Sequence, residues 1–152
     1  MTGTYIDTSL FVKSFVFEKD SPAAIKLIEA VGEPFLFSHL HEIEIPNAIR
    51  LKRFRGEITR AQETLAIRAF ESDVDSGRFF RPTYDIGTVF SRAEHLSVRH
   101  SGDLGTRSLD LLHVAAALEA GCKVFASYDH RQRKCAALSG LKVIPARIPP
   151  VP

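Results

Sequence analysis

The sequence is poor in cysteine, has no tryptophan and carries little excess charge of either sign. Cys122 and Cys135 are the only cysteines among the 152 residues, and their spacing is not that of a CxxC or zinc-finger pair. Neither a disulfide framework nor a structural zinc site therefore organises the fold. Lys and Arg number 20 against 18 for Asp and Glu, and a net charge of +2 is too small to indicate a nucleic-acid or membrane partner by itself.

Long hydrophobic runs are also missing. No apolar segment approaches the roughly 18 to 20 residues that cross a bilayer. The first ten residues have no basic lead, and Asp7 interrupts their apolar stretch, so we expect no secretory signal. We predict a cytoplasmic protein with no membrane partner.

The residues that are present suit a compact core. Hydrophobic residues make up 45% of the chain and charged residues 25%, and eleven Phe and three Tyr supply large side chains. This composition predicts one globular domain over residues 1–145. The proline-rich residues 146–152 predict an extended C-terminal tail.

Short β-branched or aromatic runs alternate with segments of helical periodicity. The runs are 4–6, 35–37, 123–126 and 142–144, and the helical segments are about 21–31, 40–54, 60–76, 83–99 and 107–120. This alternation predicts the α/β class. We expect a three-layer α/β/α domain with a central parallel sheet of four to five strands.

Three local features bear on the ends of these helices. Thr59 and Gln62 form a capping box, and Thr83 is placed to cap the helix that follows it. Pro46 falls inside the segment 40–54, where an interior proline costs roughly 3 kcal/mol. Either the helix kinks at Pro46, which we favour, or regular helix begins near Ile45 with the proline in its first turn.

Polar side chains follow three of the four predicted strands. They are Asp7, Ser38 and Asp129, and ligands of parallel α/β sheets bind beyond the carboxyl ends of the strands. Two more acids are candidates: Glu44 lies six residues after Ser38, and Asp110 stands among leucines at the start of a helix. Two carboxylates about 4 Å apart repel by about 4 kcal/mol at an effective dielectric of 20, so four in one cleft need a cation. Carboxylate oxygens favour Mg²⁺ or Mn²⁺.

Each acid also has a simpler explanation when it is taken alone. Asp7 or Asp129 can be an ordinary helix N-cap, and Glu44 can be a solvated helix residue. Asp110 can be a first-turn acid that the helix dipole favours. Spacing alone therefore leaves both explanations open.

Four segments around these acids, in this order, resemble the motifs of PIN-domain ribonucleases. They are residues 5–9 (YIDTS), 38–48 (SHLHEIEIPNA), 107–113 (RSLDLLH) and 125–129 (FASYD). The resemblance spans about residues 4–144 and is closest to the VapC toxins of type II toxin–antitoxin systems. Ser127 stands where threonine is commoner in that family, which keeps the hydroxyl group.

The resemblance implies a metal-dependent endoribonuclease toxin that hydrolyses RNA phosphodiesters to leave a 5′-phosphate and a 3′-hydroxyl. The family has a catalytic quartet of acids that binds Mg²⁺ or Mn²⁺, and the residues that match it are Asp7, Glu44, Asp110 and Asp129. Its supporting hydroxyl groups are matched by Ser9 and Ser127. We choose Glu44 rather than Glu42 on the register of the motif.

The resemblance also implies an RNA substrate, a VapB-type antitoxin and a homodimer. The amphipathic segments 9–17 and 21–31 are expected to leave apolar surface for such an interface. It does not decide which RNA is cut or whether one or two metal ions act.

Several basic residues near the acids have two interpretations each. Arg107 can contact RNA phosphate or pair with Asp110, which lies three residues along the same helical face. Arg131 is a candidate RNA contact, as are its neighbours Arg133 and Lys134. His113 is either a core residue or a catalytic one, and the core position is the commoner for a histidine on an alanine-rich helix.

Two other functions compete with this interpretation. A non-catalytic module of the same fold that binds RNA or a protein partner would be favoured if one of the four acids were missing, but all four are present. A haloacid-dehalogenase-like phosphatase needs a second acid two residues after Asp7, where Ser9 stands.

Overall fold

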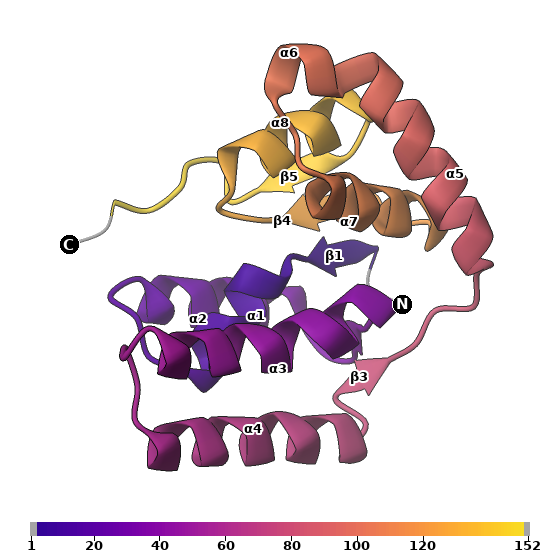
Figure 1. Cartoon of the computed structure of the whole chain (residues 1–152). Helices are drawn as coiled ribbons and strands as arrows, with labels where there is room; N and C mark the ends of the chain where they lie inside the picture. Colours follow the sequence, from indigo (N-terminus) through magenta and orange to yellow (C-terminus); the bar gives the residue numbers. More distant parts are fainter. Residues whose placement is uncertain (1–2, 151–152) are drawn as a thin grey trace. The chain divides into compact units, whose positions relative to one another are not determined.

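The computed structural model of the chain describes residues 3–150, which fall into two compact units (Figure 1). Unit 1 contains the residues up to Asp7 together with 82–148, and unit 2 contains 8–81 and the residues from Pro149. The domain of residues 1–145 and its tail stay a prediction; residues 146–150 form no helix or strand, and 151–152 lie outside the described part. Across residues 3–150, no helix is both long and apolar enough to span a membrane.

Unit 1 is built on a parallel three-stranded sheet in the order β1-β4-β5. The strands are β1 (Thr4–Ile6), β4 (Val124–Ala126) and β5 (Lys142–Ile144). Tyr5 lies opposite Phe125, and their rings stack with centroids 5.5 Å apart. Because the strands are parallel, their carboxyl ends share one edge, where Asp7 N–H donates to the Ala126 carbonyl at 2.9 Å.

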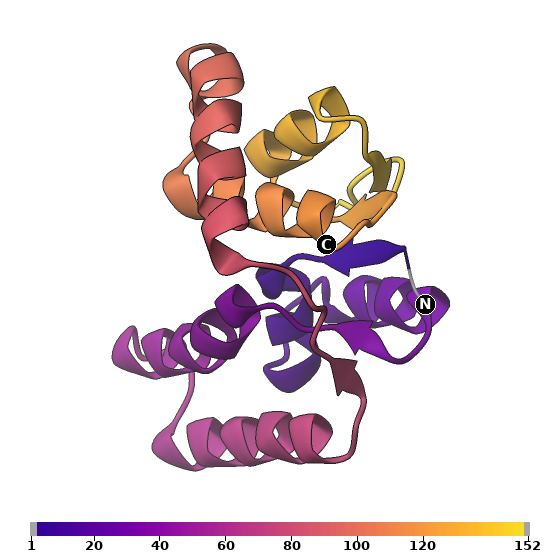
Figure 2. The ribbon, with the colours of Figure 1, turned by 90° about the vertical axis from the view of Figure 1, so that its right-hand side faces the viewer.

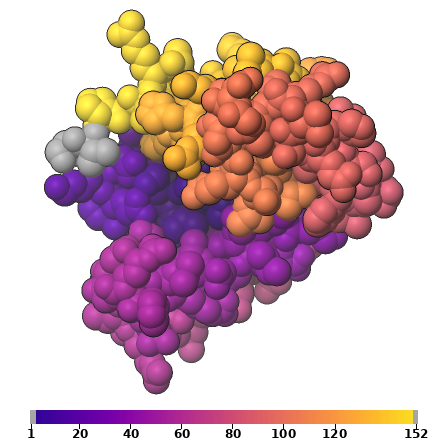
Figure 3. Space-filling view, turned by 45° about the horizontal axis from the view of Figure 1, so that its top comes forward, coloured from indigo at the N-terminus to yellow at the C-terminus, as the bar shows by residue number. Residues whose placement is uncertain are grey.

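Helices cover this sheet. They are α5 (Ile86–Leu96), α6 (Gly102–Leu104), α7 (Ser108–Glu119) and α8 (His130–Leu138), and a π-helical turn, η1 (Ser97–Ser101), joins α5 to α6. The helix α7 is the central one because it packs on both α5 and α8 (Figure 2). Its residues 113–117 are buried. Figure 3 shows α8 beside the segment from α5 to α6 on one face of this unit.

Unit 2 is mainly helical and has an aromatic core. Its helices are α1 (Thr8–Phe15), α2 (Ser21–Val31), α3 (His39–Phe54) and α4 (Arg60–Asp75), and its two strands, β2 (Phe35–Leu36) and β3 (Phe79–Phe80), pair in parallel. The rings of Phe11, Phe35, Phe37 and Phe70 all contact Phe79, with centroids between 5.1 and 6.4 Å apart.

The α/β class and the parallel sheet flanked by helices are confirmed. All four predicted strands are present, but β3, which has only two residues, was not predicted. The expected number of strands is corrected. The central sheet has three strands rather than four to five, because β2 and β3 pair with each other as a separate two-stranded sheet.

The helix ends follow the sequence in part. The capping box of Thr59 and Gln62 at the start of α4 is confirmed. The cap of α5 is Asp85 rather than Thr83, because the Asp85 carboxylate accepts from Gly87 N–H at 3.1 Å. Pro46 lies inside the continuous helix α3, so the alternative that regular helix begins near Ile45 is wrong.

Candidate functional site

Asp7 and Ser127 lie at the carboxyl edge of the sheet in unit 1. Both are buried, and each directly follows a strand, β1 or β4. The Ser127 hydroxyl lies 3.3 Å from Asp7 Oδ2 and 2.9 Å from Gln132 Oε1, and its single proton serves one of them at a time. It also accepts from Asp129 N–H at 3.0 Å. Ser127 therefore ties the end of β1 to the start of α8.

Asp110 lies in the first turn of α7, and only 5% of its surface is exposed. Its Oδ2 accepts from Arg107 N–H at 3.1 Å, which caps the helix. The same oxygen accepts from Arg107 Nε at 3.1 Å, so the carboxylate is paired with a guanidinium as well. Asp110 is therefore a first-turn acid that caps its helix, and it is also the partner of the Arg107 guanidinium.

Asp129 caps α8, as its position after a strand allowed. Its Oδ1 accepts from Gln132 N–H at 2.8 Å. Its other oxygen, Oδ2, lies 3.7 Å from Nη2 of Arg107. The two oxygens of this carboxylate therefore have different roles, one in the cap and one beside a cation.

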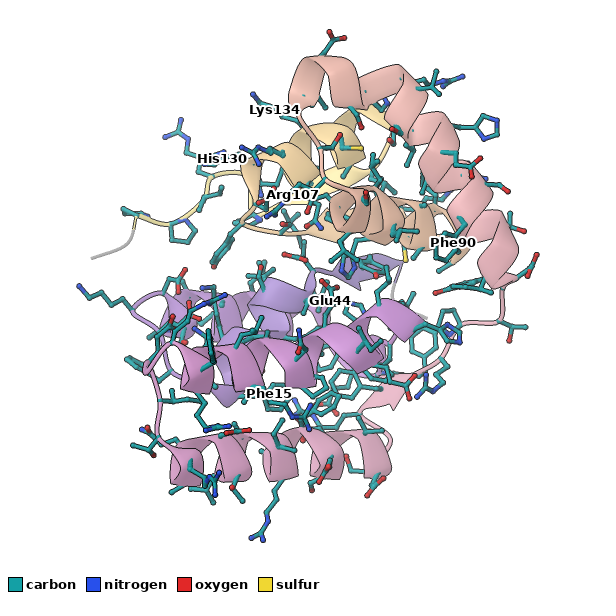
Figure 4. All side chains as sticks on the ribbon, viewed as in Figure 1. Phe15, Glu44, Phe90, Arg107, His130 and Lys134 are labelled. Atoms are coloured by element: carbon teal, nitrogen blue, oxygen red, sulfur yellow. The ribbon has the colours of Figure 1, made fainter. Side chains whose placement is uncertain are left out.

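Arg107 connects the three aspartates electrostatically. The hydrogen bond and charge of Asp110 raise the pKa of the guanidinium, and the charges of Asp129 and Asp7 raise it further. The Arg107 side chain is 66% exposed, although it lies over buried carboxylates. Asp7, Asp110 and Asp129 therefore share one charged neighbourhood, with Arg107 as a counter-ion. Figure 4 labels Arg107 at the start of α7.

The chemistry of the donor atoms in this neighbourhood fits a divalent ion. Asp7, Asp110 and Asp129 supply carboxylate oxygens, with the Ser127 hydroxyl beside them, which suits Mg²⁺ or Mn²⁺ rather than zinc. Asp7 and Asp110 are only 6% and 5% exposed, and a buried carboxylate is costly unless a positive partner or hydrogen bonds compensate it. Within residues 3–150, no three His, Cys, Asp or Glu side chains are already arranged as a complete metal site.

The remaining predicted residues of the site belong to unit 2. Glu44 is half-buried on α3, and its Oε2 accepts from the Thr8 hydroxyl at 3.1 Å. Ser9 is an exposed residue in the first turn of α1. Glu42 instead accepts two hydrogen bonds of 2.8 Å from Arg81, and this pairing lowers the pKa of Glu42. The choice of Glu44 rather than Glu42 stays a prediction based on the register of the motif.

The basic residues of α8 differ from one another. Arg131 is exposed and makes no ion pair or hydrogen bond with another described residue, so it is free to bind a ligand. Arg133 donates to the carbonyl oxygens of Ser127, Ile144 and Pro145 at 2.8, 3.2 and 2.7 Å. These hydrogen bonds make Arg133 a bridge between β4 and β5, and its role as an RNA contact stays a prediction.

Two contacts of the site were not predicted. One is Gln132, which is buried beside Ser127 and lies three residues after Asp129, a spacing that a helix capped at Asp129 brings together. The other joins Arg107 to Asp129, which depends on how α7 and α8 pack. His113 is a core residue, because it is 2% exposed and its Nδ1 lies 2.7 Å from the Tyr5 hydroxyl.

Comparison with known proteins agrees with this arrangement. The model of the PIN domain family matches residues 4–138. A search of curated proteins returned no matching relative. PIN domains are generally nucleases and typically bind divalent metals. Since the match covers most of the chain, this protein belongs to the PIN domain family.

Proposed function

We propose that the protein is a Mg²⁺- or Mn²⁺-dependent endoribonuclease and the toxin of a toxin–antitoxin pair. The observation that carries the proposal is the common charged neighbourhood of Asp7, Asp110 and Asp129 around Arg107. These aspartates come from the ends of two neighbouring strands and the start of one helix, where parallel α/β folds place their ligand sites.

In this proposal the three aspartates of unit 1 hold the ion, and the motif alone assigns Glu44 to the same role. When bound, a divalent ion supplies positive charge that polarises a phosphate oxygen and lowers the pKa of a water. Ser127 keeps Asp7 in place by its hydrogen bond, and a carboxylate of the site orients the attacking water. Attack of water on phosphorus with departure of the 3′ oxygen leaves a 5′-phosphate and a 3′-hydroxyl.

A basic surface supports RNA as the substrate. Arg107 at the start of α7 and three residues of α8, His130, Arg131 and Lys134, are all exposed. The three of them that Figure 4 labels lie at the same end of unit 1. We propose that Arg107 and Arg131 contact substrate phosphates. Binding through such contacts weakens as the salt concentration rises.

We further propose a homodimer and a VapB-type antitoxin as partners. In the expected segment 9–17, Leu10 and Phe11 are buried, whereas Phe17 is 78% exposed. Exposed apolar side chains also follow one face of α3, where Ile43, Leu51 and Phe54 are 72%, 39% and 85% exposed. A row of this kind favours a protein interface.

The direct test is cleavage of RNA by the purified chain. We expect cleavage with Mg²⁺ or Mn²⁺, its loss with EDTA, and products with 5′-phosphates. Asp7→Asn and Asp110→Asn should each lower the rate by about 10² or more, because they remove charge that holds the ion. The matched control is Asp103→Asn, an exposed aspartate of α6, which should cut at the rate of the unchanged protein.

Full activity of Asp110→Asn would contradict the assignment of the site. Salt-sensitive RNA binding without cleavage at any metal concentration would instead support the non-catalytic module of the same fold. The observation that favours this second candidate is that Arg107 already neutralises two of the acids.

A further inference from the structure

The guanidinium of Arg107 lies beside the carboxylate oxygens of Asp110 and Asp129 that take no part in helix capping. Helix capping uses Oδ2 of Asp110 and Oδ1 of Asp129, which accept from backbone N–H groups. The other two oxygens face the same nitrogen: Nη2 of Arg107 lies 3.5 Å from Asp110 Oδ1 and 3.7 Å from Asp129 Oδ2. This nitrogen therefore stands between the oxygens that would face a cation shared by the two carboxylates.

The contact is one that can open. The Arg107 side chain is 66% exposed, whereas that of Asp110 is only 8% exposed. Among the contacts of the Arg107 side chain, only that from Nε to Asp110 Oδ2, at 3.1 Å, is as short as an ordinary hydrogen bond. The two contacts through Nη2 are longer. An arginine so exposed can turn into solvent at little cost, while the buried carboxylate cannot follow it.

We propose that Arg107 is a built-in counter-ion that occupies the cation position between Asp110 and Asp129 and that a divalent ion displaces. The inference rests on the proposed function, because it concerns the same metal site. Arg107 holds the two carboxylates in place when no metal is bound, and it competes with the metal for them. Once displaced, its guanidinium is free at the rim of the site for a substrate phosphate, so metal binds before that contact forms.

The test is the affinity of the whole chain for Mn²⁺, measured by calorimetry without RNA. Arg107→Gln should bind Mn²⁺ roughly fivefold more tightly than the unchanged protein, the factor expected when one exposed ion pair no longer competes. Arg107→Lys, which keeps the charge, should remain close to the unchanged protein. The matched control is Arg92→Gln, which removes an arginine paired with Glu119 in the same unit and should leave the affinity unchanged.

A second measurement uses the unchanged protein and so does not depend on how a variant folds. In a ¹H–¹⁵N spectrum, the Nε–H signal of Arg107, assigned by its loss in Arg107→Lys, should move toward the position of solvated arginine as Mg²⁺ is added. The Nε–H signal of Arg81, which pairs with Glu42 in unit 2, should not move.

The outcomes separate this inference from the proposed function. Mn²⁺ binding of equal or lower affinity in Arg107→Gln, or an Arg107 signal that Mg²⁺ leaves unchanged, would overturn the counter-ion role while the metal site stands. Absence of Mn²⁺ binding in the unchanged protein and in Arg107→Gln alike would overturn the metal site itself, and the counter-ion role with it.

Discussion

At the scale of single residues, the buried polar side chains of unit 1 make specific contacts. Tyr5 is fully buried and its hydroxyl lies 2.7 Å from Nδ1 of His113, so one hydrogen bond connects β1 to α7. Asp7 lies two residues after Tyr5, and Asp110 three residues before His113. The Tyr5–His113 contact therefore helps to hold together the two segments, β1 and α7, that position these acids.

We expect Tyr5→Phe to lower the free energy of unfolding by about 1–2 kcal/mol, because it removes a buried hydrogen bond at almost unchanged volume. Urea denaturation measures the effect. The control is Tyr84→Phe, a half-buried tyrosine of the same unit with no hydrogen bond to another described residue, which should change the free energy by less than about 0.5 kcal/mol. Equal effects of the two variants would show that the Tyr5 hydroxyl adds nothing.

Burial of the Cys122 thiol predicts a loss of stability at alkaline pH. Burial raises the pKa of Cys122 from 9.0 to about 11. The unfolded chain therefore loses this proton first, so the stabilisation is complete below pH 9 and is lost as the pH rises toward 11. In reducing buffer, the free energy of unfolding should fall across this range, and Cys122→Ala should fall less steeply. Parallel curves for the two proteins would contradict the shifted pKa.

The sequence could single out three acids that the structure places near Arg107, because Asp7 and Asp129 come just after strand-like runs and Asp110 stands among leucines. It could also predict that Arg107 and Asp110 face each other, since they are three residues apart at a helix start. The contact of Arg107 with Asp129 could not be predicted, because it joins two helices whose packing no local pattern specifies. The burial of His41 was missed for a similar reason: its ring packs edge-on to Phe11, thirty residues earlier in the sequence.

At the scale of elements, α8 carries one arginine bound to backbone carbonyl groups and one that is exposed to solvent. Arg133 joins the carboxyl ends of β4 and β5 through three backbone carbonyl groups, whereas Arg131 projects from the same helix into solvent. The sequence presents both as one basic run. Only the position of β5 beside β4 distinguishes them.

Arg133→Gln should therefore lower the free energy of unfolding by about 1.5–3 kcal/mol, the range for hydrogen bonds to a charged group. Arg131→Gln should leave stability unchanged and weaken RNA binding, with a smaller dependence on salt. Thermal unfolding and RNA titration of both variants check the pair. The opposite assignment, with Arg131 needed for folding, would contradict the described hydrogen bonds.

The short strand β3 shows where element prediction ends, because β2 was expected from the run 35–37 and β3 was not. Two residues are too few for the alternation that identifies a strand, and the pairing of β3 with β2 depends on a shared aromatic core around Phe79. Caps, by contrast, are local, and the box of Thr59 and Gln62 is found where the sequence places it.

At the scale of the whole molecule, the exposed apolar row on α3 predicts self-association. We expect light scattering to give the mass of a dimer, and Phe54→Ser combined with Ile43→Ser to give that of a monomer, because both remove exposed apolar surface. Val98→Ser changes an equally exposed side chain in unit 1 and should leave the dimer intact. A monomeric unchanged protein would contradict the proposed interface.

The central claim, that Asp7, Asp110 and Asp129 hold a divalent ion, is tested most directly by locating Mn²⁺ in the unchanged protein. Paramagnetic broadening in a ¹H–¹⁵N spectrum at low Mn²⁺ should be strongest for the backbone signals around these aspartates and Ser127, and excess Mg²⁺ should reverse it. Broadening centred elsewhere, or none at millimolar Mn²⁺, would contradict the account.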